Sequence, residues 1–174
     1  MTIIWLKYSV MGLCFVLGAL LHARLGLSQA WYLYAGAGLL AMTQLLMGNV
    51  WSAYSALKRG QLQQASRILK QVWAPGMLLK RNRAYFYFTK GMLALQAKQL
   101  DGAATGLEEA INTGLEHPND GALAALNLAH ISYVKQNWGS AAEWLEKARS
   151  FAVNDLMIKE KMSELEQALA SRQN

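Results

Sequence analysis

Three short segments decide the fold: GQLQQASRILKQV at 60–72, KQLDGAATGLEEA at 98–110 and QNWGSAAEWLEKA at 136–148. Each begins 38 residues after the one before, so the chain contains an internal repeat. In every segment an alanine is followed four residues later by a leucine, and three residues after that by a small or branched residue. The coinciding residues are Ala65, Ala103 and Ala141, then Leu69, Leu107 and Leu145, then Val72, Ala110 and Ala148.

A second set of small residues stands twelve positions before the alanines, at Ala53, Gly91 and Ala129. Small residues on two successive helices let their backbones approach closely, and leucines one turn on fill the space between neighbouring pairs. Both prolines of the chain fall in the connections between pairs, where a helix must stop. We therefore expect three antiparallel helix pairs, at 46–58 and 62–73, 83–98 and 101–114, and 120–136 and 139–151.

This repeated pattern resembles the tetratricopeptide-repeat (TPR) family over about Leu46 to Val153. It departs from the family in its period, 38 residues against the usual value of about 34, and in lacking the first-helix tryptophan and tyrosine at their usual places. The resemblance implies an all-α fold in which three TPR-like pairs, within 46–153, form a helical solenoid. A bundle of ordinary helical hairpins is the alternative.

The last segment, 154–174, is predicted to be a capping helix and tail. An Asn-Asp start precedes apolar residues at helical spacing, which indicates an amphipathic helix over Asn154–Ala170. Repeat arrays need such a cap with a polar outer face. The apolar positions are Leu156, Ile158, Met162, Leu165 and Leu169.

The first fifty residues hold two long apolar runs, at about 3–21 and 30–50. Runs of this length are typical of membrane spans, and aromatic residues stand near both ends of the second run. The sequence therefore predicts a two-helix transmembrane hairpin over 1–50. No linker separates its second helix from the first repeat, so we also expect one continuous helix from about Trp31 to Lys58.

Charge predicts the orientation of this hairpin. The first hundred residues carry eleven Lys and Arg and no acidic residue, while all eleven acidic residues follow position 100. Positive charge flanks the spans at Lys7 and after Trp51, so we expect both termini and the repeats to be cytoplasmic. A cleaved signal peptide or a single span are the alternatives, and only a single span would reverse the C-terminal part. The chain resembles small bacterial inner-membrane TPR proteins with an N-terminal hairpin, and this resemblance implies that the protein is located in a bacterial inner membrane.

Basic residues close to the second span are expected to contact anionic lipid headgroups, since each Lys or Arg near such a leaflet contributes about 1 kcal/mol. Nucleic-acid binding is the less favoured interpretation, because the excess of positive charge is confined to the region beside the spans. It would require salt-sensitive binding through the cluster at 80–83. The membrane-proximal basic residues are Lys58, Arg59, Lys80, Arg81 and Arg83.

No residue pattern predicts catalysis. The three histidines lie far apart in the sequence, without the spacing of a metal site, and the paired acids Glu108 and Glu109 are expected to face solvent. A glycine-rich run near Gly36 lies inside a predicted span, where it cannot form a phosphate loop. We therefore expect no enzyme activity, no metal, no cofactor and no small-molecule substrate.

The resemblance implies that the first helices of the pairs line a groove that binds a protein partner, either a peptide or an amphipathic helix. An aromatic and Met-rich groove favours apolar segments. The alternative for each residue is a place in the core between repeats. The expected function is that of a membrane-anchored adaptor or accessory subunit, or else a transport or secretion component whose hairpin is itself functional. The groove residues are Tyr54, Tyr85, Phe88, Met92, Gln96, Asn127, His130 and Tyr133.

Overall fold

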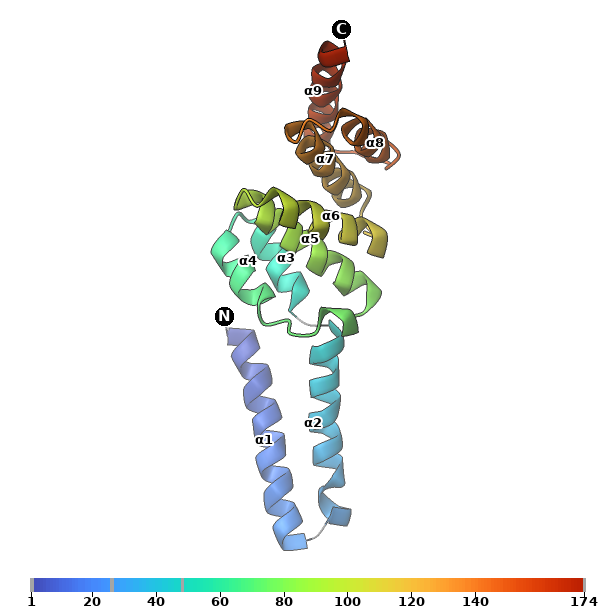
Figure 1. Cartoon of the computed structure of the whole chain (residues 1–174). Coiled ribbons are helices and arrows are strands. Elements are labelled where there is room, and N and C mark those ends of the chain that lie inside the picture. The colour runs from blue at the N-terminus through green and yellow to red at the C-terminus, as the bar shows by residue number, and fades with distance from the viewer. Residues whose placement is uncertain (1, 26, 48, 174) are drawn as a thin grey trace. The chain divides into compact units, whose positions relative to one another are not determined.

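The chain is all-helical over the residues that the computed structural model describes, namely 2–25, 27–47 and 49–173 (Figure 1). Helices and connecting loops account for these residues, and none of them lies in a strand. The chain divides into two compact units, Met1–Gly48 and Asn49–Asn174, and we describe each by itself.

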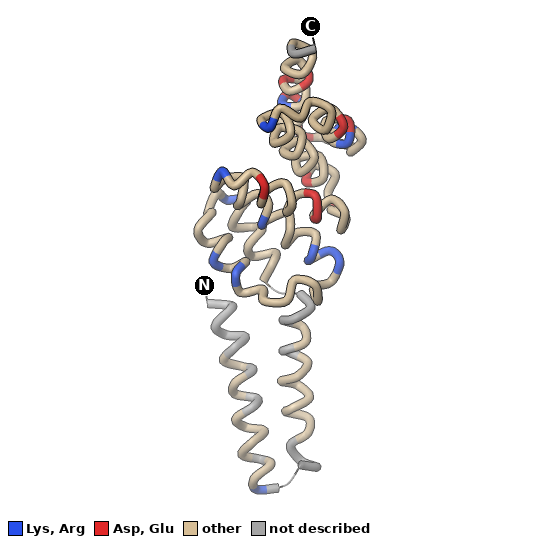
Figure 2. The backbone as a smooth tube through the Cα atoms, in the orientation of Figure 1, with Lys and Arg blue, Asp and Glu red and all other residues tan. Residues whose placement is uncertain are grey.

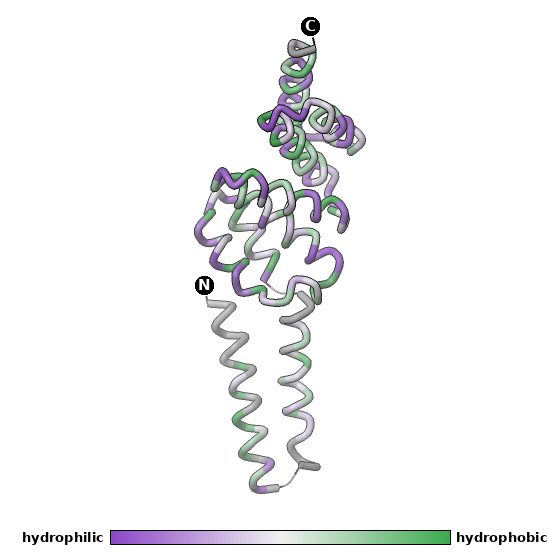
Figure 3. Tube along the Cα trace, in the orientation of Figure 1, coloured by the Kyte–Doolittle hydropathy of each residue, from purple (hydrophilic) through white to green (hydrophobic). Residues whose placement is uncertain are grey.

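The first unit is a hairpin of two helices, α1 (Thr2–Leu25) and α2 (Leu27–Met47), which pack against each other. Gly18 allows a close approach, because a Cβ there would lie 3.1 Å from the ring of Tyr34. Apolar residues predominate in the described parts of both helices (Figure 3). Among the described residues, no helix combines the length with the apolar character needed to cross a membrane. The side chain of Lys7 lies outside the described part, and the transmembrane assignment stays a prediction.

The expected continuous helix from Trp31 to Lys58 is wrong. Helix α2 ends at Met47 and α3 begins at Val50, with Asn49 between them in a non-helical conformation (φ −101°, ψ 26°). The buried Asn49 side chain donates a hydrogen bond to Gln71 Oε1 (3.2 Å), and its carbonyl accepts the first bond of α3 from Ala53 N (3.1 Å). Asn49 is thus the N-cap residue of α3, although its side chain bonds Gln71 and makes no capping hydrogen bond to the helix.

The second unit contains three helix pairs, as expected, with shifted ends. Helix α3 packs against α4, α5 against α6, and α7 against α8, and α5 also contacts α3 and α4. A short 3-10 turn, η1, precedes α5. The bounds are α3 Val50–Lys58, α4 Leu62–Leu69, η1 Pro75–Met77, α5 Lys80–Gln96, α6 Leu100–Thr113, α7 Pro118–Val134 and α8 Trp138–Arg149.

The turn inside each pair has the same backbone geometry. Its left-handed residue is Gly60 (φ 73°), Lys98 (φ 58°) or Gln136 (φ 61°), again 38 residues apart. In all three turns this residue's N–H and that of the next residue donate back to carbonyls of the preceding helix, as at Gly60 N to Leu57 O (2.9 Å) and Gln61 N to Ala56 O (2.9 Å). This is the Schellman arrangement. The sequence repeat therefore corresponds to a repeated local structure.

The coinciding positions of the repeat are core positions. The three alanines of the second helices and the small residues of the first helices are buried, as are the three leucines. At the last coinciding position of the repeat, Ala110 and Ala148 are fully buried, whereas Val72, which lies beyond the end of α4, is half-buried. The small-residue pattern thus marks the surfaces where helices meet.

Helices α5 and α6 cross most closely at two glycines. A Cβ on Gly106 would lie 2.8 Å from Gly91 Cα, and a Cβ on Gly91 would lie 2.9 Å from the backbone nitrogen of Leu107. Real Cβ atoms do not come this close to other backbone atoms. Glycine is therefore required at both positions for the observed crossing.

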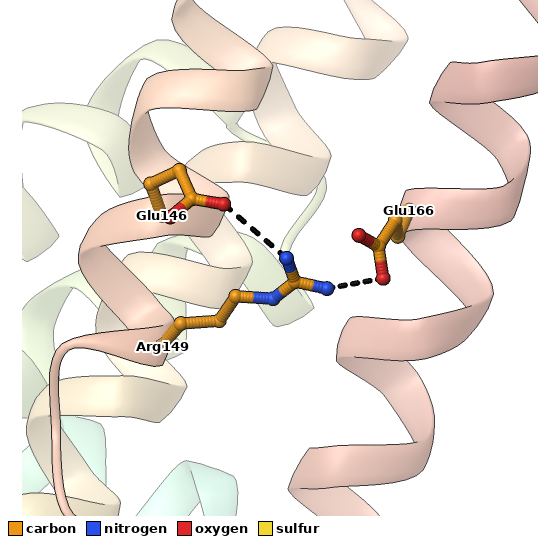
Figure 4. A network of polar contacts seen from close by, with 3 residues as sticks. All are labelled: Glu146, Arg149 and Glu166. Carbon is orange, nitrogen blue, oxygen red and sulfur yellow. Dashed lines mark hydrogen bonds and ion pairs between the residues drawn. The ribbon is translucent and has the colours of Figure 1, made fainter.

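Helix α9 (Leu156–Gln173) covers α7 and α8. Its buried face consists of Ile158, Met162, Leu165 and Leu169, as expected, but Leu156 is 74% exposed. Leu156 is the first helical residue, after Asp155, whose side chain accepts a bond from Met157 N (2.9 Å). Arg149 of α8 pairs with Glu166 of α9 and with Glu146 (3.2 Å) of its own helix (Figure 4).

Candidate functional site

Aromatic side chains from α3 and α5 gather around one carboxylate from α7. Tyr85 is fully buried, with its ring centroid 4.9 Å from that of Tyr54 and 4.8 Å from that of Trp51. Phe88 packs edge-on against both tyrosines, at 6.0 Å and 6.4 Å. Edge-to-face pairs of this kind contribute about 0.5–1.5 kcal/mol each beyond the area they bury. The cluster therefore joins the first two helix pairs.

The carboxylate is Asp120, in the first turn of α7. One of its oxygens, Oδ2, accepts hydrogen bonds from the hydroxyls of Tyr54 (2.7 Å) and Tyr85 (3.0 Å). Asp120 is 9% exposed, and a negative charge in the first turn of a helix is favoured by the helix dipole. Three helices are thus linked by one acceptor. We call Tyr54, Tyr85 and Asp120 the Tyr-Tyr-Asp triad.

The surroundings keep both phenols of the triad protonated. Burial is the main reason that the pKa of the Tyr54 hydroxyl is raised far above its ordinary value, and its hydrogen bond to Asp120 adds to the effect. Burial likewise raises the pKa of the Tyr85 hydroxyl, followed by repulsion from the Asp120 charge. Both hydroxyls therefore act as hydrogen-bond donors and not as bases or nucleophiles. The role of the triad that follows from its chemistry is structural: its two hydrogen bonds link α3 and α5 to α7.

A cation and an anion flank the cluster at the surface. The Arg81 guanidinium lies 4.6 Å from the ring centroid of Trp51, and its Nε is 2.9 Å from a carboxylate oxygen of Glu116. Both members of the ion pair are about half exposed, so the pair contributes about 0–1 kcal/mol. Its position still ties the loop before α7 to the beginning of α5.

The expected groove residues divide by depth. Tyr54, Tyr85 and Phe88 are buried, so in this structure they belong to the core between repeats. Met92, Asn127 and Tyr133 are half-buried, while Gln96 and His130 are exposed. Asn127 Nδ2 donates to Leu123 O (2.7 Å) and lies 3.7 Å from Met92 Sδ, which brings α5 and α7 together. The accessible part of the predicted groove is therefore confined to the later helices.

The expected membrane-proximal basic residues also have different environments. Lys58, Arg59 and Lys80 are exposed, and Lys58 Nζ lies 5.3 Å from the ring centroid of Tyr54. Arg81 is engaged with Trp51 and Glu116. Arg83 is half-buried, and its Nη1 donates to Gly76 O (3.4 Å). Only part of this set is thus available to a charged partner.

Within the part of the chain that the structure describes, no three His, Cys, Asp or Glu side chains gather as a metal site. His22 lies in α1, His117 precedes α7, and His130 is exposed on α7. Glu108 and Glu109 are exposed on α6, as expected.

Two features were missed by sequence reasoning. Asp120 was not recognised as the acceptor for two tyrosines 35 and 66 residues earlier, although an acid two residues after a helix-starting proline is a signal for a first-turn carboxylate. Trp73, in the loop before α5, was not singled out, and it is 82% exposed. A proline two residues on, Pro75, indicates a loop there.

No protein-family model, no curated protein and no solved structure matches this chain. The likeness to tetratricopeptide repeats therefore rests on the residues of this sequence, and it stays a prediction.

Proposed function

We propose that this chain is a membrane-anchored protein-interaction module that carries out no catalysis. Its hairpin, α1 and α2, would sit in a membrane, and its helix pairs would form a TPR-like solenoid that holds a segment of a protein partner. The partner would be a peptide or an amphipathic helix, or a subunit of a membrane assembly. The charge pattern favours an orientation with the repeats in the cytoplasm, and the resemblance to small bacterial inner-membrane TPR proteins implies that the membrane is a bacterial inner membrane.

The observation that carries the proposal is the exposure of apolar side chains on both helices of the hairpin. Leu13, Leu20 and Leu39 are 59%, 58% and 64% exposed, and Trp31 is 62% exposed. Water penalises such surface by about 25 cal/mol for each Å² of apolar area, and monomeric soluble proteins rarely expose large continuous patches of it. A lipid environment removes this penalty.

The repeated turns support the interaction role. Three pairs with the same turn geometry present equivalent positions of their first helices, 38 residues apart, as solenoids that bind extended partners do. Tyr54, Met92 and His130 occupy such equivalent positions on the three first helices. Tyr54 is buried, Met92 is half-buried and His130 is exposed. An incoming segment would therefore meet α7 and the end of α5.

Two measurements test the proposal. Membrane anchoring predicts that the full-length chain stays in the membrane fraction after an alkaline carbonate wash, and release by the wash would contradict it. Partner binding is tested with a photo-crosslinking amino acid at His130, in the predicted groove, and at Glu108, which is also exposed but lies on a second helix. We expect a defined protein adduct from position 130 and none from position 108. Equal capture at both would argue against the groove.

A second candidate function is a transport or secretion component whose hairpin acts within the membrane. The observation in its favour is that a Cβ added at Gly12, Gly36 or Gly38 would meet no described atom within 4 Å. Small residues with open space beside them permit another helix to pack closely. Replacing residues 1–45 with a foreign membrane anchor distinguishes the two. Retained partner binding and activity favour the interaction module, whereas retained binding with lost activity favours the transport component.

A further inference from the structure

The loop between α4 and α5 exposes three large apolar side chains within seven residues. Trp73, Met77 and Leu79 are 82%, 53% and 50% exposed. Trp73 is the most exposed large apolar side chain in the described part of the chain. Single exposed apolar residues are ordinary, but a cluster that includes a tryptophan marks an interaction surface.

The fold fixes this exposure. Leu78 is 4% exposed and belongs to the core, and the backbone is extended at Leu78 and Leu79 (ψ 145° at both). With φ of −63° and −53°, this segment is similar to a polyproline II helix, in which successive side chains point in different directions. Burying Leu78 therefore leaves Leu79 pointing away from the core, and Met77, the last residue of η1, is exposed beside it. Arg83 holds the loop through Gly76 O (3.4 Å).

The charge around the loop is mainly positive. Lys70 and Lys80, at its two ends, are exposed, and neither forms an ion pair with any other described residue. Two carboxylates lie near the beginning of α5: Glu116 pairs with Arg81, and Glu109 lines a surface hollow together with Lys80 and Arg83. Figure 2 shows Lys and Arg around the loop, with Asp and Glu only from α6 onward. The two lysines are left for an outside partner.

A second exposed apolar pair helps to identify that partner. Leu156 and Met157 at the start of α9 are 74% and 65% exposed, but there two acids, Asp155 and Glu160, balance two lysines, Lys159 and Lys161. Such a balanced site has no net attraction to an anionic membrane, whereas an excess of lysines attracts it by about 1 kcal/mol each. Tryptophan is also the residue that prefers the boundary between headgroups and acyl chains. Apolar exposure occurs at both places, but only the loop, whose residues 70–80 include two lysines and no acid, combines it with a net positive charge.

We propose that this loop, residues 70–80, is a membrane-contact site that takes an anionic phospholipid surface, with Trp73, Met77 and Leu79 entering the interface and Lys70 and Lys80 contacting headgroups. The inference rests on the membrane anchoring proposed above and adds a second contact to it. Such a contact would fix the orientation of the second unit at the bilayer, because the chain would then be attached to the membrane at two points, the hairpin and the loop.

The test uses the full-length chain with its one cysteine removed (Cys14→Ser) and a new cysteine at Trp73→Cys or, as the matched control, Met157→Cys. Each is labelled with an environment-sensitive dye and reconstituted into vesicles of phosphatidylcholine alone or mixed with phosphatidylglycerol. Lipids with a quencher on the acyl chain report on depth. Both positions are exposed, so neither substitution disturbs the core.

We expect the dye at 73 to shift to shorter wavelength and to be quenched several-fold more than the dye at 157 in the anionic vesicles. The double substitution Lys70→Glu with Lys80→Glu should abolish the difference. The inference is overturned if the dye at 73 is quenched no more than the dye at 157. It is also overturned if position 73 becomes protected only in native membranes and stays in water in pure lipid, because a protein then covers the loop.

Failure of the anchor gives a different result. An alkaline carbonate wash of the same vesicles reports on the hairpin independently of the dye. Chain retained after the wash, with a dye at 73 that stays in water, overturns the loop contact and leaves the anchor standing. Chain released by the wash overturns the anchor, and with it the premise of the loop contact.

Discussion

The close crossing of α5 and α6 gives the sharpest test of the fold. Replacing Gly106 with alanine would place a Cβ 2.8 Å from Gly91 Cα, 2.9 Å from Gly91 N and 3.2 Å from Tyr87 O. All three are backbone atoms, which cannot rotate away as a side chain can. Since carbon atoms pack best at about 3.5–4.0 Å, the two helices would have to separate by roughly 1 Å.

The magnitude follows from two opposing effects. Overpacking a well-packed contact costs about 1–3 kcal/mol, and the upper end applies where backbone must move. Alanine in place of glycine inside a helix returns about 1 kcal/mol. We therefore expect Gly106→Ala to lower the free energy of unfolding by about 2 kcal/mol, which is roughly 4–8 °C in Tm for a chain of this size.

Gly102→Ala is the matched control, in the same helix. There the nearest atom to the new Cβ would be Ala94 Cβ, at an ordinary contact distance of 3.8 Å. The propensity gain is then unopposed, so we expect stability to rise by up to about 1 kcal/mol. Guanidinium unfolding of the full-length chain in detergent, followed by far-ultraviolet circular dichroism, measures both variants. If Gly106→Ala is as stable as Gly102→Ala, the helices do not cross as closely as described.

Three further predictions concern the second unit. Asp120→Ala should lower the free energy of unfolding by about 2–4 kcal/mol, because it leaves two buried hydroxyls without an acceptor, whereas Tyr54→Phe should lower it by only about 1–2 kcal/mol. If denaturation curves show that the two variants are equally stable, this prediction is wrong. Stability should fall as pH rises above about 10, because Tyr54 and Tyr85 ionise there in the unfolded chain, while their raised pKa values keep them neutral in the folded chain. Absorbance at alkaline pH should show that both phenols ionise only when the chain unfolds, and ionisation before unfolding would contradict the prediction. Arg149→Ala should lower the free energy of unfolding by less than about 1 kcal/mol, because its ion pairs are exposed, whereas Met162→Ala should lower it by about 2–5 kcal/mol. If denaturation shows that Arg149→Ala is the less stable variant, charge and not apolar packing holds α9 in place.

The helix pairs could be predicted from the sequence because their signals are local. A recurring alanine and leucine set the buried face of each second helix, and the turns follow from the same spacing. Helix ends were less predictable, since they depend on single residues. Helix α7 begins at Pro118, two residues earlier than expected, because proline suits the first position of a helix. Helix α4 ends at Leu69, four residues earlier than expected.

The false continuous helix had a visible contrary signal. A Gly-Asn pair at 48–49 is typical of helix ends, because both residues favour caps over helix interiors. The prediction rested on the absence of a linker between the apolar run and the first repeat, and it gave this pair no weight. What could not be seen in the sequence was the partner of Asn49, since Gln71 lies 22 residues away at the far end of the first pair.

The groove was harder to predict than the helices, because helix register does not tell which side chains a later element will cover. Tyr54, Met92 and His130 occupy equivalent positions, yet their exposure differs. Tyr54 is covered because Asp120 of the third pair reaches back to its hydroxyl. Among the described residues after α8, the element that packs on α7 and α8 is the single helix α9, and His130 is exposed. Burial in a repeat array thus depends on the position of each pair in the array.

The charge asymmetry of the chain takes on a structural meaning at Asp120. The first hundred residues contain no acidic side chain, yet the aromatic cluster of α3 and α5, which lies within them, has two buried hydroxyls that need an acceptor. That acceptor comes from the first turn of α7, in the acidic part of the chain. An uncompensated buried hydroxyl costs about 1–3 kcal/mol, so the first two pairs reach their full stability only when the third pair is folded against them. The basic and acidic parts of the repeats are therefore expected to unfold together, as one cooperative structure.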